Sequence, residues 1–233
     1  MTTRTTIPAT DEYLDLITSF HRPRARFGEV IRQSVAPFVA VGGLLDGLPA
    51  DFDLDLAIGA QLDVVGEWVG RDRNIQIPLV STWFAFDYVG QGFDEGAWKG
   101  NYDPAWGIYA LDDDTYRSLL RAKIAANNWD GIAAGMAEGL SYLFQTDGTN
   151  VFAAARDDVA LIVGIAGIIP GLVPLAIVYG GYVPFKPAGV STEYLVSSIN
   201  GTALFSFDAA GSDYAAGFDA GSLGIGIDKI FGI

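Results

Sequence analysis

The 233-residue chain contains no cysteine and only one histidine, His21. Without cysteine there are no disulfides, no thiolate nucleophile and no zinc site of the His/Cys type. Any Ser-His-Asp chemistry would depend on His21 alone. This histidine stands in a helix-ending turn before Pro23, so we predict a surface or capping residue rather than a catalyst. The lack of cysteine also fits assembly in the cytosol.

Basic residues are scarce. The chain has 14 Lys and Arg but 28 Asp and Glu, so its net charge is −14. Binding to nucleic acid or to an anionic membrane needs a dense basic stripe. The densest basic segment contains Arg22, Arg24 and Arg26, and uncharged residues separate these arginines. We therefore expect no nucleic-acid partner. The N-terminus is polar and lacks the apolar stretch of a signal peptide.

Motifs that carry chemistry are also lacking. Aspartates cluster at residues 51–55 and 112–114, but both clusters precede predicted helices and lack calcium-loop spacing. No phosphate-binding glycine loop occurs, and nothing singles out a carboxylate pair for glycoside hydrolysis. The sequence therefore predicts no enzyme, no catalytic residue, no metal and no cofactor.

One long uncharged segment, residues 159–183, resembles a membrane span in length. Pro170, Pro174 and several glycines argue against one uninterrupted helix. A strand over residues 159–165 and a helix over 170–179 explain the pattern better. We expect this segment to form buried core, and an integral membrane protein is the third-ranked interpretation.

Half of the residues are apolar, and the first third of the chain shows helical periodicity. The pattern predicts helices over residues 10–20, 24–41 and 54–69, with a loop over 42–52. Thr10 is a suitable N-cap for the first helix. Pro37 should kink the second helix or end it early.

The remaining chain alternates between two kinds of segment. Residues 112–126 and 131–144 predict a helical hairpin, with Asp112 or Asp113 capping the first helix and Asp130 the second. A turn over 186–190 leads into another strand. Residues 71–111 are rich in Gly, Asp and aromatics and predict a long ordered loop with short strands. The fold class is therefore α+β, in four regions: 1–72 (helical), 73–111 (Gly/aromatic), 112–191 (small α+β unit) and 192–233 (Gly/aromatic).

The two Gly/aromatic segments share a faint repeat, FxFD followed by GFDxGxxG. The first copy spans 84–100 and the second spans 205–224. Aromatic residues are common anchors of protein interfaces, but they can equally pack on the protein's own core. The residues predicted to bind a partner are Leu14, Ile17, Phe20, Phe27, Ile31, Trp83, Phe93, Trp98, Trp106 and Phe218.

Residues 53–71, 111–131, 186–190 and 11–18 together resemble a family of baseplate wedge proteins from contractile phage tails. The resemblance covers about residues 10–224 and points to the smaller, tail-protein-I-like component of the wedge trifurcation unit. It implies that one copy joins two copies of a larger wedge protein through a helical bundle, and that six wedges surround the hub. It also implies that the C-terminal region lies toward the tail fibres or fibre-attachment proteins.

These observations predict a structural component of the tail baseplate, located in the virion and assembled in the host cytoplasm, with no membrane in the resting particle. The alternative is a carbohydrate- or receptor-binding module whose two GFD segments form the binding surface.

Overall fold

The computed structural model describes residues 9–79, 93, 97–144, 148–156, 159–186, 188–207 and 214–231. The chain divides into two compact units, Met1–Val65 and Gly66–Ile233, which are described separately below. Helices and strands are both present, which confirms the predicted α+β class.

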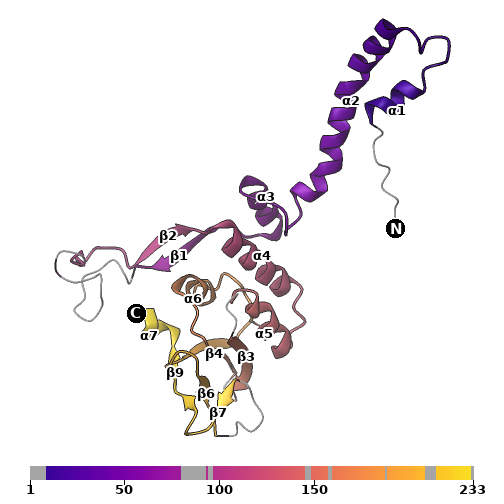
Figure 1. The fold of residues 1–233 in the computed structure, drawn as a ribbon. Coiled ribbons are helices and arrows are strands. Elements are labelled where there is room, and N and C mark those ends of the chain that lie inside the picture. Colours follow the sequence, from indigo (N-terminus) through magenta and orange to yellow (C-terminus); the bar gives the residue numbers. More distant parts are fainter. Residues whose placement is uncertain are drawn as a thin grey trace. The chain divides into compact units, whose positions relative to one another are not determined.

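The first unit is helical. Helix α1 (Thr10–Asp15) lies beside the first half of α2 (Ala25–Asp51), and Arg32 of α2 forms a 2.9 Å ion pair with Asp11 of α1 (Figure 1). The predicted helix over 10–20 is too long. After Asp15 the backbone forms tighter turns, in which amides donate hydrogen bonds to carbonyls three residues earlier. Ala9 rather than Thr10 is the N-cap, and it makes no side-chain bond.

Helix α2 differs more from its predicted bounds than the other helices of this unit. It runs through Pro37 and across the whole of the predicted loop 42–52. Pro37 removes the donor for the Gln33 carbonyl, but both residues are exposed, so water can hydrate that oxygen. Helix α3 (Ala60–Val69) starts six residues later than predicted, because the Asp53 carboxylate accepts a bond from the Asp55 amide at 2.9 Å and holds a separate turn.

The second unit begins with a two-stranded antiparallel ribbon of β1 (Asn74–Pro78) and β2 (Trp106–Ala110), which are short strands of the kind predicted for this region. Helices α4 (Asp113–Asn127) and α5 (Ala133–Ser141) then form the predicted hairpin. The Asp112 carboxylate caps α4 by accepting from the Thr115 amide at 3.1 Å, as predicted. The predicted start of α5 at residue 131 is wrong, since Gly131 has a φ of 90° and Ile132 is the N-cap.

A four-stranded sheet follows, in the order β3-β4-β5-β9. Strand β3 (Thr149–Arg156) pairs antiparallel with β4 (Ala160–Gly167), and helix α6 (Leu172–Tyr179) crosses from β4 to the parallel strand β5 (Ser191–Ser197). Strand β9 (Gly224–Gly226) completes the sheet. The sequence analysis did not predict β3.

The C-terminal part covers one face of this sheet. Strand β6 (Ala203–Phe205) pairs in parallel with β7 (Ala215–Ala216) and β8 (Gly221–Ser222). Helices α4, α5 and α6 lie on the other side of the sheet (Figure 1). The short helix α7 (Ile227–Phe231) ends the described chain.

The uncharged segment 159–183 supplies much of the core between sheet and helices. Val163, Ile165, Leu175 and Ile177 are all buried, which confirms the buried-core interpretation. Among the residues that the structure describes, no helix combines the length and apolar character needed to cross a membrane.

Candidate functional site

The most extensive apolar surface of the first unit follows α2. Seven of its positions are spaced alternately four and three residues apart, which is the heptad spacing of a coiled-coil seam. These positions, here called the α2 stripe, are Phe27, Ile31, Ser34, Phe38, Val41, Leu45 and Leu48. At about 100° per residue they fall on one face of the helix. Six of the seven are apolar.

The α2 stripe is open to solvent in the described unit. Phe38 is 78% exposed and Leu45 is 58% exposed, and Leu44 beside them is 71% exposed. Arg32, which forms the ion pair with α1, projects from a different side of α2. Large apolar residues gathered along one helix, rather than scattered singly, mark a surface that another protein covers.

The predicted binding residues of the first unit lie at the joint between α1 and α2. Leu14, Ile17 and Ile31 are half-buried, while Phe20 is 69% exposed. The rings of Phe20 and Phe27 both lie 4.9 Å from His21. This histidine is therefore half-buried between two aromatic rings, and its buried Nδ1 has no hydrogen-bond partner.

The predicted aromatic residues of the loop region divide into two groups. Trp106 is half-buried, stacks on Tyr179 with centroids 6.0 Å apart and meets the edge of Phe231 at 6.3 Å. This tryptophan contributes to the packing of its own unit. Phe93 and Trp98 are exposed, in keeping with surface positions. Trp83 lies outside the described residues.

Phe218 belongs to a cluster that the second copy of the repeat assembles. Its ring lies 4.8 Å from Phe205 and 5.6 Å from Phe207. Phe207 is 87% exposed and Phe218 is 80% exposed. The FxF and GFD halves of this copy therefore meet in space and present two phenyl rings to solvent. Most of the first copy, including residues 84–87, lies outside the described residues.

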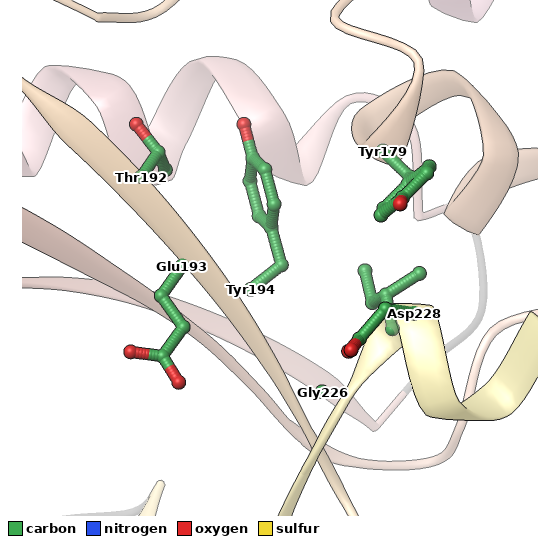
Figure 2. Close-up of a pocket in the computed structure, with 7 residues that line it drawn as sticks. Tyr179, Thr192, Glu193, Tyr194, Gly226 and Asp228 are labelled. Carbon is green, nitrogen blue, oxygen red and sulfur yellow. The ribbon is translucent and has the colours of Figure 1, made fainter. Parts of the chain in front are cut away.

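A pocket of about 280 Å³ lies beside β5 in the second unit (Figure 2). It exists because β9 pairs only with Leu195–Ser197, which leaves the first half of β5 without a strand on that side in the described structure. Thr192 and Tyr194 project from one face of β5 and Glu193 from the other. Tyr179 and Asp228 line the opposite wall.

The pocket is suited to hydrogen bonding. The buried Thr192 Oγ1 has no partner among the described residues. Burial raises the pKa of the Tyr194 phenol, because desolvation penalises the phenolate, so this hydroxyl remains a neutral donor. Glu193 is neutralised by Arg156 at 2.7 Å. The lining offers hydroxyls and carboxylates but no imidazole or amine to act as a base near neutral pH.

A 27-residue helix with an open heptad stripe is typical of a protein that functions inside a larger assembly. A family model described as bacteriophage baseplate wedge 1 protein matches residues 13–194, and the chain belongs to this family. No curated protein matches the chain significantly.

Family membership confirms the predicted phage baseplate wedge protein. The family is a structural component of the baseplate, so the chain is located in the tail of the virion and interacts with other baseplate proteins.

The sequence analysis missed the second half of the α2 stripe. Val41, Leu45 and Leu48 were not among the predicted binding residues, because Pro37 was expected to kink the helix or end it early and residues 42–52 were predicted to form a loop. The unbroken alternation of four and three from residue 27 to residue 48 is the signal that could have revealed them.

Proposed function

We propose that the chain joins larger wedge proteins into the ring around the baseplate hub through the α2 stripe. One copy of this chain packs α2 against helices from two copies of the larger wedge protein. The observation that carries the proposal is the open heptad stripe, because five of its six apolar residues are exposed in the described first unit.

The energetics support a bundle. Full burial of a large apolar side chain contributes about 1.5–3 kcal/mol. Five members of the stripe are large exposed side chains: Phe27, Phe38, Val41, Leu45 and Leu48. Their combined burial is enough to offset the entropy lost on association. Phe20 extends the same apolar surface beyond the start of α2.

The proposal extends to the C-terminal region. Residues beyond 194 lie outside the family match and carry the exposed rings of Phe207 and Phe218. Aromatic rings of this kind anchor protein interfaces. We therefore propose that this region contacts tail fibres or fibre-attachment proteins, and that the chain has no catalytic activity of its own.

The test is co-expression of the full chain with the larger wedge protein of the same phage. Replacement of Phe38, Val41 and Leu45 together with serine should abolish co-purification. The control replaces Gln33, Ala36 and Ala40 with serine, because these positions lie on the opposite side of the same helix and are exposed. If both variants co-purify with the larger wedge protein at the wild-type level, docking through the stripe is refuted.

The second candidate function is a carbohydrate- or receptor-binding module. It is favoured by the Phe207–Phe218 pair, since exposed aromatic faces can stack on sugar rings, and Asp219 follows Phe218 directly. A glycan array probed with the full chain and with Phe207→Ala/Phe218→Ala separates the two functions. Binding that depends on these rings supports the module, and a silent array removes it.

A further inference from the structure

The hairpin of α4 and α5 contains a pocket of about 270 Å³ in the second unit. The end of α4 forms one wall through Ala125 and the C-cap Asn128. The turn and one face of α5 form the rest, with Trp129, Asp130, Gly135, Glu138 and Tyr142. Small-molecule sites usually measure about 300–1,000 Å³, so this pocket is better matched to one side chain of another protein.

Gly135 leaves room in this pocket without a packing reason of its own. Alanine is the better helix former, and a Cβ at position 135 would lie 3.4 Å from Trp129 Cδ1 and 3.6 Å from Asp130 Oδ1, which are ordinary contacts. Gly139 is different, because a Cβ there would overlap the ring of Phe185. Glycine is the residue that lets a ligand approach the backbone closely. The missing side chain at position 135 therefore leaves space beside the Trp129 ring and the Asp130 carboxylate.

The groups around the pocket favour positive charge. The carboxylates of Asp130 and Glu138 line it, and neither forms an ion pair with any residue that the structure describes. Asp130 Oδ1 accepts a hydrogen bond from the Ile132 amide at 3.0 Å, which holds this carboxylate in the turn. The C-terminus of α4, the negative end of its dipole, lies beside the pocket and has no basic residue in its last turn. Each of these features favours a cationic ligand.

Two aromatic rings narrow the choice of cation. Trp129 is half-buried, and its Nε1 donates to the Ile132 carbonyl at 2.7 Å, so the indole is fixed in place. Tyr142 follows Glu138 by one helical turn and is 43% exposed. Aromatic rings attract cations, and the planar guanidinium of arginine combines stacking on rings with hydrogen bonds to carboxylates. The ammonium of lysine is more strongly hydrated and suits this lining less well.

We propose that this pocket binds an arginine side chain of another baseplate protein. Arginine is enriched at protein interfaces, whereas lysine is depleted there. The net charge of −14 also favours a basic partner at long range. The site lies in the second unit, and its occupation does not depend on docking through the α2 stripe.

The test titrates the full chain with N-acetyl-arginine amide and follows the Trp129 indole resonance and the Gly135 amide by NMR. A single side chain should bind with a dissociation constant of roughly 1 mM. N-acetyl-citrulline amide has nearly the same shape but no charge. It should bind at least about tenfold more weakly, which is the scale of one charge-assisted hydrogen bond.

Two variants locate the binding. Gly135→Ala should weaken binding of the arginine amide by roughly tenfold, because the new methyl group and the guanidinium compete for the same space. The same variant should melt at or above the wild-type temperature, so binding and stability move in opposite directions, which a purely structural role of Gly135 does not explain. Asp130→Asn with Glu138→Gln keeps the side-chain shapes and the acceptor for the Ile132 amide. It should make the arginine and citrulline probes bind alike.

The control is Asp219→Asn with Asp228→Asn, which changes the net charge by the same amount at exposed positions outside the pocket lining. It should bind the arginine amide as wild type does. The proposal is overturned if the Trp129 resonance does not respond to the arginine amide, if the citrulline amide binds wild type equally well, or if either pocket variant retains the wild-type affinity. None of these outcomes bears on docking through the α2 stripe, which the co-purification test decides separately.

Discussion

Two glycines of helix α5 provide a sharp test of how the second unit is packed. Gly135 and Gly139 lie one turn apart, and replacing either with alanine gains about 1 kcal/mol of helix propensity. A Cβ at Gly135 would lie 3.4 Å from the nearest atom of Trp129, which is an ordinary contact. A Cβ at Gly139 would overlap the ring of Phe185, with both Cε atoms at 2.9 Å.

The Phe185 ring has little freedom to move away. Its side chain is 2% exposed, and its ring meets that of Trp129 edge to face at 5.9 Å. Overpacking of a core typically costs about 1–3 kcal/mol. We therefore expect Gly135→Ala to raise the free energy of unfolding by up to about 1 kcal/mol. Gly139→Ala should fall about 1–3 kcal/mol below that level.

Thermal unfolding of the full chain measures the difference. For a domain of this size, 1 kcal/mol corresponds to about 2–4 °C in melting temperature. The Gly139→Ala variant should melt clearly below Gly135→Ala, and a second substitution, Phe185→Leu, should reduce the gap by making room for the new methyl group. Equal melting temperatures for the two alanine variants would show that the α5–Phe185 contact is not packed as described.

Three further predictions concern the same unit. Leu120 is fully buried and Arg121 is exposed, so Leu120→Ala should cost about 2–5 kcal/mol in the free energy of unfolding, whereas Arg121→Ala should leave the melting temperature of the isolated chain nearly unchanged. The side-chain bond from Thr115 lowers the pKa of Asp112 below its ordinary 3.8. Asp112→Ala should therefore cost about 1 kcal/mol at neutral pH, and this difference should vanish as the pH falls through the lowered folded-state pKa, measured by denaturant unfolding between pH 7 and pH 2. Val159, directly before β4, has a φ of 59°, an unfavourable conformation for a β-branched residue. Val159→Gly should thus match or exceed the wild-type melting temperature, and a clear drop would mean that the valine side chain contributes more than its backbone strain costs.

Local signals in the sequence determined part of this fold. The capping aspartate at 112 and the helical pattern of residues 112–126 predicted α4, because capping and helical periodicity act within a few residues. Pro170 likewise marked the break between strand β4 and helix α6. The family resemblance was also present in the sequence, and the match over residues 13–194 confirms it.

Tertiary structure decided the features that depend on distant residues. The second half of strand β3 has three consecutive alanines at 153–155, which have little strand propensity, so its pairing with β4 holds this half in the strand. Trp106 was predicted to bind a partner, but Tyr179 and Phe231, which lie far along the chain, pack against it. The length of α2 was also hidden, because the local preference of Pro37 predicted a kink or an early end, whereas the helix continues through it to Asp51. Periodicity and capping report short-range preferences, and strand pairing, ring packing and docking surfaces are set by which distant groups meet.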